Sequence, residues 1–469
     1  MTKLVLIRPS IDYDETPQNL KKFFPPPGGN YYKEPPMGIL YVAASCLKAD
    51  IKTKIVDQYS RNMTNEEVLR IINRQKPDFV GFSLTSFTLK NSKELARMIK
   101  EKNKNCRIVV GGPWVTMRGK EILENEEFDF GIYGEGEITL PELIENYRNR
   151  KKLDEIKGLI FRDKNKIILN EPRPFIEDLD SVPYPAYQIV NMDDYARGRS
   201  IYVDREPVDY ICATRGCPYA CAFCSSKEIW KRKYRMRNPV KVVDEMEYMM
   251  KKFKTKGFHF RDDNLTVNRR FVLELCEELK KRKLPIKWMC ESRVDTLDEE
   301  IIEKMKESGC SGMWFGIESG SQKVLDYLNK GIALNRIRKT IKLCQEYGLR
   351  VGGSFMLGVP IETRETIKKT VDFAKSLKLT NTWFNQFIGI PDCEIYEEIK
   401  KKKLYKCSFN GMLIVETPQF SGDEIFEIIR KNNFYFEVKR LGLILETHSP
   451  SEYPKMALYA LRSLLSFFK

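Results

Sequence analysis

The sequence Cys217-Pro218-Tyr219-Ala220-Cys221-Ala222-Phe223-Cys224 has three cysteines with the spacing C-x3-C-x2-C. It follows an apolar run, Val208 to Ala213, that predicts a β-strand, and then a Thr214-Arg215-Gly216 turn. A charge-rich stretch with helical character comes after it. The sequence therefore predicts three thiols on one short loop at the carboxyl end of a strand, where α/β folds place their chemistry.

Three thiolates on one loop can bind three irons of a 4Fe–4S cluster and leave the fourth iron open to a ligand. The alternatives are structural zinc or ordinary buried cysteines. Zinc needs a fourth ligand, usually from a second close pair, whereas the other cysteines of this chain are scattered. The two histidines, His259 and His448, have no ligand spacing with each other. The pattern favours a cluster.

This loop resembles the cluster motif of radical S-adenosylmethionine (SAM) enzymes, with the aromatic Phe223 between the second and third cysteines. The resemblance implies that the open iron is chelated by the amino and carboxylate groups of SAM. It also implies that one electron from the cluster cleaves SAM to methionine and a 5′-deoxyadenosyl radical, which abstracts hydrogen from a substrate.

Length and composition set broad limits. A chain of 469 residues predicts two to four domains of about 150 residues each. The net charge of +15 is compatible with acidic partners, but the lysines are spread along the chain as on a solvated surface. We therefore expect no nucleic-acid partner.

Twelve cysteines without paired spacing argue against a disulfide framework. The start of the chain, Met1 to Arg8, is too short in apolar residues for a signal peptide. There is also no apolar run of about 18 residues that would span a membrane. These features predict a reduced, cytoplasmic location.

Residues 1–148 alternate predicted strands and helices, which indicates one doubly wound, Rossmann-like (flavodoxin-like) parallel sheet. The predicted strands are 4–7, 53–56, 79–84, 107–110 and 130–133, and the predicted helices are 37–47, 65–73, 92–104, a segment that includes 121–123, and 141–147. Such sheets bind ligands beyond the carboxyl ends of their strands. Four loops there are candidates for a ligand site, although each glycine in them can equally be a plain turn residue.

This segment resembles the cobalamin-binding domain that precedes many radical SAM domains, over about residues 1–145. The best-known such domains carry a D-x-H-x-x-G motif, whose histidine binds cobalt from below. Here Asp57 is followed by Tyr59 in the histidine position and by Asn62 in the glycine position, so cobalamin is expected without a histidine ligand. The residues expected to bind it are Asp57, Tyr59, Ser83, Thr85, Ser86, Gly111, Gly112, Pro113, Gly134, Glu135 and Gly136.

Residues 149–205 are expected to be a linker. It contains a small predicted hairpin, 158–162 with 166–169, followed by a proline-rich acidic strap.

Residues 206–400 repeat a strand-then-helix unit six times, which predicts a partial, TIM-like β/α barrel with active groups at the strand ends. After the strand that precedes the cysteines, the predicted strands are 258–261, 287–290, 313–317, 352–357 and 382–388. The radical SAM family has this fold, so the period and the motif agree.

Polar groups follow these predicted strands and resemble the SAM-binding segments of the family. Asp262 and Asp263 can pair with the SAM ammonium, and Arg293 can pair with its carboxylate through a bidentate fork. Helix capping and salt bridges are the structural alternatives. The full set expected to bind SAM is Phe223, Asp262, Asp263, Arg293, Glu318, Ser319, Leu357 and Gly358, beside the cluster ligands Cys217, Cys221 and Cys224. No residue is assigned a further catalytic role.

Residues 401–469 are expected to form a helical extension. They lack a second cysteine cluster, which argues against relatives with auxiliary clusters. The segment Tyr453 to Phe468 has apolar residues at helical spacing and can dock on the barrel or lie peripherally on a membrane.

The sequence thus predicts an enzyme, a cobalamin-dependent radical SAM C-methyltransferase. Two other functions stay open: an oxidative or ring-forming radical enzyme like the anaerobic magnesium-protoporphyrin monomethyl ester cyclase, and a non-catalytic cobalamin or cluster carrier. The expected partners are a small-molecule, lipid or peptide substrate and an electron donor such as ferredoxin or flavodoxin.

Overall fold

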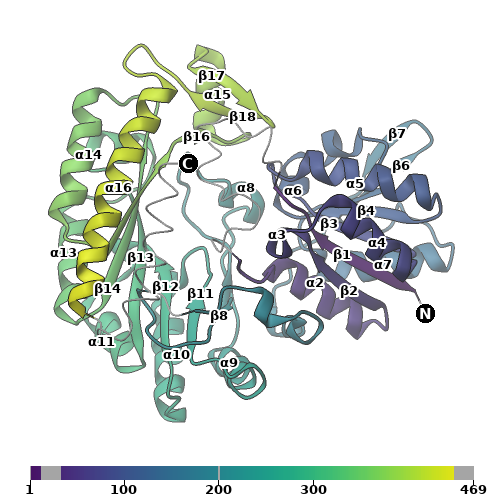
Figure 1. Cartoon of the computed structure of the whole chain (residues 1–469), viewed down its shortest axis with the longest axis horizontal. Coiled ribbons are helices and arrows are strands. Elements are labelled where there is room, and N and C mark those ends of the chain that lie inside the picture. Colours follow the sequence, from purple (N-terminus) through teal and green to yellow (C-terminus); the bar gives the residue numbers. More distant parts are fainter. Residues whose placement is uncertain (1, 12–32, 199–200, 448–469) are drawn as a thin grey trace. The chain divides into compact units, whose positions relative to one another are not determined.

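The computed structural model describes residues 2–11, 33–198 and 201–447. It divides the chain into two compact units, Met1–Ala196 and Arg197–Lys469 (Figure 1). Each unit is built on its own sheet.

The first unit is a doubly wound sheet. Its strand order, within the described residues, is β2-β1-β3-β4-β5-β6-β7. Pairing is parallel from β2 to β5. The strands are β1 (Lys3–Arg8), β2 (Lys52–Asp57), β3 (Phe79–Ser83), β4 (Arg107–Gly111), β5 (Phe130–Ile132), β6 (Leu159–Asp163) and β7 (Lys166–Leu169). The helices are α2 (Met37–Lys48), α3 (Gln58–Arg61), α4 (Asn65–Gln75), α5 (Leu89–Lys102), α6 (Pro113–Leu123) and α7 (Gly136–Arg148). The predicted doubly wound, flavodoxin-like sheet is confirmed.

The sheet forms because its central strands are apolar on both faces. The four residues Leu4 to Ile7 are all buried, as expected of a parallel strand covered by helices on both sides. Helix α4 follows β2 and the short helix α3. It starts with a capping box between Thr64 and Glu67. Local capping and burial on both faces thus explain why the strand–helix alternation was readable from sequence.

The predicted linker is different in the structure. Its hairpin, β6 with β7, extends the first sheet, because β6 pairs antiparallel with β5 and places Phe161 opposite Phe130. Leu159 and Ile160 are buried there and cover an edge that β5 would otherwise leave open. The boundary between the compact units falls at Ala196 and Arg197, within the expected linker 149–205.

The second unit is an open, parallel barrel. Within the described residues its strands run in the order β8-β11-β12-β13-β14-β15, and all neighbours are parallel. They are β8 (Val208–Ile211), β11 (Gly257–Phe260), β12 (Lys287–Ser292), β13 (Cys310–Glu318), β14 (Arg350–Leu357) and β15 (Asn381–Gln386). The helices between them are α9 (Pro239–Phe253), α10 (Arg269–Arg282), α11 (Glu299–Glu307), α12 (Gln322–Tyr327), α13 (Leu334–Glu346) and α14 (Arg364–Ser376). The predicted six-unit partial barrel is confirmed.

The sequence predicts a helical extension over residues 401–469, but the described part of this segment also contains strands. After β15 come α15 (Glu394–Lys402) and a small antiparallel sheet, and only then the long helix α16 (Gly422–Thr447). The small sheet consists of β16 (Ile388–Gly389), β17 (Tyr405–Phe409) and β18 (Met412–Val415). It was missed because its strands are short and pair only with each other. The predicted amphipathic segment 453–468 lies outside the described residues.

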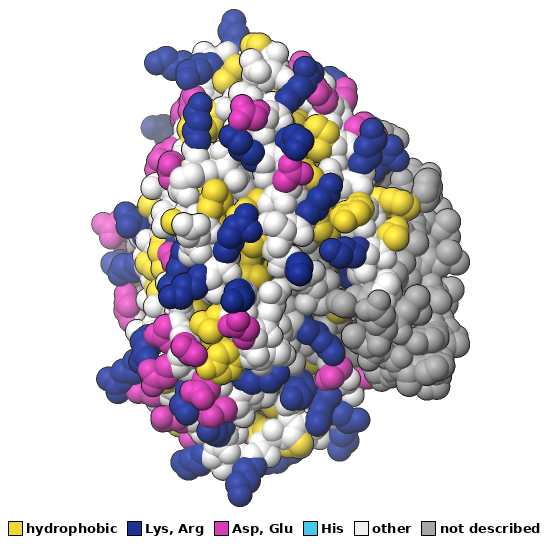
Figure 2. Space-filling model, turned by 90° about the vertical axis from the view of Figure 1, so that its left-hand side faces the viewer, with side chains coloured by type: hydrophobic (Ala, Val, Ile, Leu, Met, Phe, Trp, Pro, Cys, Tyr) yellow, Lys and Arg dark blue, Asp and Glu magenta, His cyan; other side chains and the backbone are white. Residues whose placement is uncertain are grey.

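In the described part of the chain, no helix is long and apolar enough to cross a membrane. Figure 2 shows the face that carries α13, α14 and α16, where Lys and Arg side chains are spread and interspersed with Asp and Glu. The charge on this face is distributed and does not form one basic patch.

Candidate active site

The three cysteines lie where the sequence placed them, in a hairpin loop beyond β8. The loop starts after β9 (Thr214–Arg215), continues into α8 (Ser226–Trp230), and returns in β10 (Arg235–Met236), which pairs antiparallel with β9. Gly216 opens the loop with φ +87, and a Cβ there would overlap the carbonyl oxygen of Lys233. Only glycine therefore fits this close approach.

The thiols are poorly hydrated. Cys221 is buried, and Cys217 and Cys224 are half-buried. Burial, more than any other cause, raises the pKa of Cys224 to about 11 and also raises that of Cys217, with the neighbouring cysteines and Asp263 adding to it. Thiolates here need a compensating positive centre, which bound iron supplies. The donor set fits a cluster.

Within the described residues, no three His, Cys, Asp or Glu side chains converge as the ligands of a single metal ion would. A cubane cluster does not need such convergence, because each cysteine binds a different iron.

Asp262, expected to contact the SAM ammonium, lies buried beyond β11. One oxygen, Oδ1, accepts hydrogen bonds from the backbone N of Ala213 at 2.9 Å and the hydroxyl of Thr214 at 2.7 Å. The other oxygen, Oδ2, is buried and has no partner among the described residues. Burial raises the pKa of Asp262 to about 7. An unpartnered carboxylate oxygen of this kind fits a cationic ligand group.

Asp263 differs from its neighbour. It is exposed and accepts a hydrogen bond from the hydroxyl of Ser226, at the start of α8, at 2.9 Å. The structure thus separates the two carboxylates that the sequence left equivalent: Asp262 is buried in the barrel, and Asp263 braces the helix after the cysteines.

Glu318 ends β13 in a left-handed conformation, with φ +69. Its Oε1 accepts a hydrogen bond from the buried ammonium of Lys330 at 2.9 Å. Burial opposes the charged form of Lys330, but Glu318 outweighs it and keeps the lysine pKa above its usual range. Non-glycine residues at positive φ are uncommon and often mark functional sites. Lys330 lies 5.9 Å from the ring centroid of Phe223, which ties Glu318 to the cysteine loop.

Three other expected SAM residues serve packing as well. Ser319 is fully buried and its hydroxyl lies 3.0 Å from that of Thr370 on α14. Leu357 is also fully buried, and a Cβ on Gly358 would lie 3.2 Å from Ile425 of α16. Ser319 and Gly358 thus face helices that cover the sheet, so their backbone is the better candidate for ligand contact.

Glu362 was missed by sequence reasoning. Its Oε2 accepts from the backbone N of Gly358 at 2.7 Å and of Val359 at 2.9 Å, and so fixes the loop after β14. Burial raises the pKa of Glu362 to about 7. A glutamate just before a helix is usually exposed, so nothing in the sequence indicated that the Glu362 side chain is buried.

Arg293 does not offer the free fork that we expected for the SAM carboxylate. Its Nε and Nη2 already bind the two oxygens of Asp295, at 3.0 and 2.9 Å. Its remaining edge faces the cysteine loop, with Nη1 3.7 Å from the Sγ of Cys221.

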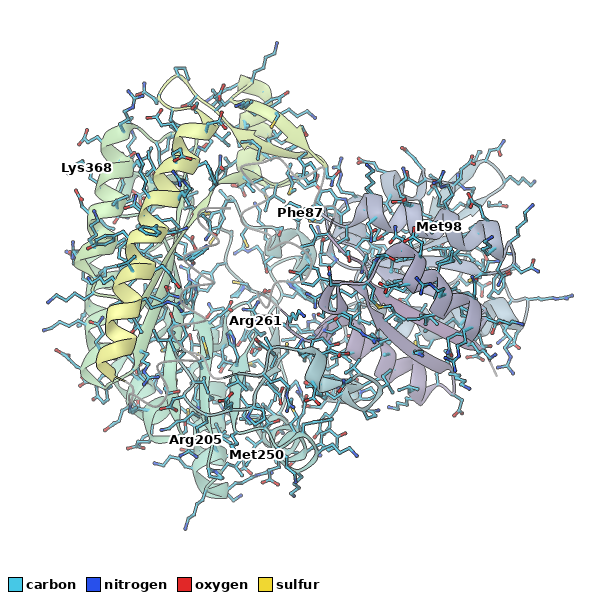
Figure 3. The ribbon with its side chains drawn as sticks, in the orientation of Figure 1. Phe87, Met98, Arg205, Met250, Arg261 and Lys368 are labelled. Carbon is cyan, nitrogen blue, oxygen red and sulfur yellow. The ribbon has the colours of Figure 1, made fainter. Side chains whose placement is uncertain are left out.

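A charged group also lies at the ends of β11 and β12. Arg261, labelled in Figure 3, pairs with Glu291, and the Nε2 of His259 lies 3.5 Å from Oε1 of the same glutamate. Burial would raise the pKa of Glu291, but His259 and Arg261 outweigh it and hold the pKa below its usual range. This group was not identified from sequence, because its members are about 30 residues apart in the chain.

In the first unit, the expected cobalamin residues follow β2, β3, β4 and β5, whose carboxyl ends lie at one edge because the strands are parallel. Two of them have structural partners. Asp57 caps α3 through the N of Ser60 at 2.9 Å, and Glu135 accepts from the N of Ile176 at 2.8 Å. For both, the side chain is committed to the fold.

The other loops present backbone and small side chains. Gly112 has φ +94, and a Cβ there would lie 3.0 Å from the backbone N of Leu84. Gly134 also has positive φ, and a Cβ there would meet no heavy atom within 4 Å. Ser86 is buried, and Thr85 bonds through its N to the hydroxyl of Thr88 at 3.0 Å. The open space beside the Gly134 backbone fits a large flat ligand, whereas the Gly112 backbone packs against Ser83 and Leu84.

Tyr59, in the histidine position, is half-buried beneath the guanidinium of Arg8, 4.8 Å from its ring centroid. Burial raises the pKa of Tyr59, which disfavours the phenolate form that binds metals. The residues present fit a corrin held without a protein ligand to cobalt.

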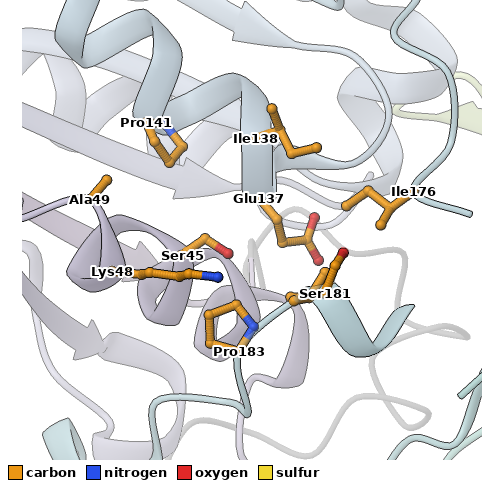
Figure 4. A pocket seen from close by; sticks show the side chains of 10 residues that line it. Ser45, Lys48, Ala49, Glu137, Ile138, Pro141, Ile176, Ser181 and Pro183 are labelled. Carbon is orange, nitrogen blue, oxygen red and sulfur yellow. The ribbon is translucent and has the colours of Figure 1, made fainter. Parts of the chain in front are cut away.

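A pocket of about 280 Å³ lies elsewhere in this unit, between α2, α7 and the segment 176–183 (Figure 4). Its lining includes Lys48, Glu137 and Ile176, and none of the expected cobalamin residues. It therefore has no part in the site described above.

Fold and site together define a class of protein: a cluster-bearing, open α/β barrel preceded by a doubly wound ligand-binding domain. Two family models match the chain, the radical SAM superfamily over residues 211–374 and the B12 binding domain over residues 30–144.

A protein of Pyrococcus horikoshii, named as an uncharacterised methyltransferase, is 30% identical over 415 residues, covering 87% of this chain and 89% of that protein. The anaerobic magnesium-protoporphyrin IX monomethyl ester cyclase of Cereibacter sphaeroides is 28% identical over 379 residues, 78% of this chain but only 60% of the cyclase. The cobalamin-dependent SAM radical enzyme OxsB, solved with aqua-cobalamin and SAM, superposes with a TM-score of 0.76 at 17% identity, covering 100% of this chain and 72% of OxsB.

The chain belongs to the radical SAM superfamily, in the class that carries an N-terminal B12 binding domain. It is a radical SAM enzyme, and the cofactors of this class are a 4Fe–4S cluster, SAM and cobalamin.

Proposed function

We propose that this enzyme methylates an unactivated carbon of its substrate through cobalamin. The observation that carries the proposal is the match over 87% of this chain with the Pyrococcus horikoshii protein named as an uncharacterised methyltransferase. When bound, the cluster and SAM supply a radical that abstracts hydrogen, and cobalamin supplies the methyl group.

The chain's own residues would hold these groups. Cys217, Cys221 and Cys224 are the proposed cluster ligands. The unpartnered Oδ2 of Asp262 is suited to a cationic group, and Glu318, held by Lys330, is suited to hydroxyl donors. The glycine loops of the first unit are suited to the corrin.

The test is the nucleoside products made from SAM by the enzyme with cluster and cobalamin bound, under a strong reductant and without added substrate. Methyl transfer through cobalamin consumes SAM to S-adenosylhomocysteine, whereas radical formation yields 5′-deoxyadenosine. We expect both products, and we expect Cys221→Ala to lose 5′-deoxyadenosine. If a protein with an intact cluster forms neither S-adenosylhomocysteine nor 5′-deoxyadenosine, the proposal is contradicted and a carrier function is favoured.

The second candidate is an oxidative or ring-forming radical reaction. It is favoured by the similarity to the Cereibacter sphaeroides cyclase, although this chain spans only 60% of that protein. This function predicts 5′-deoxyadenosine without S-adenosylhomocysteine, and with substrate a loss of hydrogen or gain of oxygen in place of a gain of CH2.

We also propose that the electron comes from an acidic protein such as ferredoxin or flavodoxin. Support comes from Lys231, Arg232 and Lys233, three consecutive exposed cations just after α8. The Nε of Arg232 donates to the carbonyl oxygen of Pro218 at 3.1 Å, so this basic turn lies against the cysteine loop. A negatively charged donor would be attracted to it.

Replacing these three residues by glutamate should slow cluster reduction by reduced flavodoxin about tenfold or more. In the unaltered enzyme, the rate of this reduction should fall steeply as salt is added. Reduction by dithionite should not change. The matched control replaces Lys400, Lys401 and Lys402, exposed on α15, and should behave like the unaltered enzyme. Equal loss in both triple variants would mean that general charge, and not this turn, attracts the donor.

A further inference from the structure

Arg293 is a buried cation whose hydrogen-bonding capacity is almost fully used inside the barrel. Its Nε and Nη2 bind Asp295, and Nη2 also donates to the carbonyl oxygen of Lys330 at 2.7 Å. Only Nη1 remains, and it faces the sulfur of Cys221 at 3.7 Å. The side chain is thus held in one orientation, with Nη1 directed at a proposed cluster ligand.

The contact with the cysteine loop is broad. The guanidinium also lies over the ring of Tyr219, 3.7 Å from its centroid. Both Arg293 and Cys221 are buried, which keeps water from screening the interaction. A guanidinium stays charged under all ordinary conditions, so the sulfur always faces a positive donor.

The turn 328–330 contacts both the cysteine loop and Arg293 and so holds them relative to each other. The backbone N of Ala222 donates to the carbonyl oxygen of Leu328 at 2.9 Å, and the amide of Asn329 donates to the carbonyl oxygen of Ala220 at 2.8 Å. The same turn receives Nη2 of Arg293. Cysteine loop and guanidinium are therefore fixed to one support.

The ion pair with Asp295 offsets part of the charge that Arg293 presents to the sulfur. Asp295 binds the opposite edge of the guanidinium and is partly exposed, with 25% of its side chain accessible. Lys330, the other buried cation nearby, is paired with Glu318. The Nη1 edge is therefore a positive group directed at the Cys221 sulfur, and Lys330 also acts on this sulfur through its charge.

We propose that Arg293 is a positioning residue that raises the reduction potential of the cluster through its hydrogen bond to Cys221. Reduction adds one negative charge to the cluster and its thiolates, and a charged donor at a ligand sulfur stabilises that reduced form more than the oxidised one. The effect makes the cluster easier to reduce by a biological donor. The inference rests on the proposed role of the three cysteines as cluster ligands.

The test is an EPR-monitored potentiometric titration of the reconstituted protein, without SAM, using dithionite as the one-electron reductant. Iron and sulfide content is measured first in every variant. Arg293→Gln should shift the midpoint potential to more negative values, and Arg293→Lys, which keeps the charge but not the fork, should shift it less. Asp295→Asn should shift it the opposite way, because it removes the counter-charge and leaves the guanidinium more positive.

Arg282→Gln is the matched control, because Arg282 is a largely buried, ion-paired arginine at the C-terminus of α10, away from the cysteines. Its potential should equal that of the unaltered protein. An unchanged potential in Arg293→Gln with full iron content would overturn the inference. If that variant loses its cluster, the shifts of Arg293→Lys and Asp295→Asn decide. Midpoint potentials equal to that of the unaltered protein in both variants would also overturn the inference. Absence of a cluster from the unaltered protein would instead contradict the proposed function.

Discussion

Gly112 is a single residue on which the geometry of the proposed corrin loops depends. It combines φ +94 with a site where a Cβ would lie 2.9 Å from Ser83 Oγ and 3.0 Å from the N of Leu84. Gly112→Ala should lower the free energy of unfolding by about 2–3 kcal/mol, because both the backbone and the packing become strained. Urea denaturation measures this, with Gly38→Ala in α2 as the control.

A Cβ on Gly38 meets no heavy atom within 4 Å, and its φ lies outside the left-handed region. That variant should be unchanged or up to about 1 kcal/mol more stable, since alanine favours helix. Equal destabilisation of the two variants would contradict the geometry at Gly112.

Glu362 should make stability depend on pH. Burial raises its pKa to about 7 in the folded chain, above the ordinary value of about 4.3. The folded state therefore keeps a proton that the unfolded state releases, so this residue's contribution is fully present below about pH 4 and is lost as pH rises towards 7.

Glu362→Gln should thus gain stability relative to the unaltered protein between pH 5 and pH 8, by on the order of 2–4 kcal/mol. Urea denaturation at both pH values measures the gain. Glu365→Gln, at an exposed position at the start of α14, should show no such gain. A difference between Glu362→Gln and the unaltered protein that is the same at both pH values would contradict a titrating Glu362.

At the scale of elements, α16 closes the open edge of the barrel sheet. Asn433 accepts from the backbone N of Phe384 at 2.8 Å and donates to its carbonyl oxygen at 2.9 Å, so one side chain satisfies both groups of an edge residue in β15. Asn433→Ala should cost about 2–3 kcal/mol of unfolding free energy, because it leaves two buried backbone groups unpaired.

Asn432→Ala is the matched control for thermal or urea unfolding, since the hydrogen bond of Asn432 among the described residues is to the carbonyl oxygen of Ile428 within its own helix. It should change stability by less than about 1 kcal/mol. A similar loss in both variants would show that α16 is destabilised as a helix and that the contact with β15 is not the cause.

Elements set by local pattern were predictable, and elements set by distant partners were not. The strands and helices of both sheets follow hydrophobic period, and the cysteine loop follows spacing within eight residues. The hairpin β6–β7 was assigned to a linker, because its place in the sheet depends on β5. In the site, Arg293 was predicted from the sequence as a SAM ligand, but its partner Asp295 was not, and nothing in the sequence indicated that Lys330 and Glu362 are buried.

At the scale of the whole molecule, one chain carries two domains with separate cofactors, and the proposed function needs both. The barrel without a corrin would leave the radical chemistry but no methyl carrier, and the first unit alone would leave a cobalamin carrier. The account therefore requires that cluster and corrin bind to the same protein and that the cysteines control only one of them.

Anaerobic reconstitution with iron, sulfide and hydroxocobalamin, followed by desalting and measurement of iron, cobalt and the visible spectrum, tests this most directly. We predict about one 4Fe–4S cluster and about one corrin per chain, with Cys221→Ala losing the cluster and keeping the corrin. A cluster without corrin would remove methyl transfer and favour the cyclase-like reaction. No cluster in the protein with Cys217, Cys221 and Cys224 intact would contradict the account.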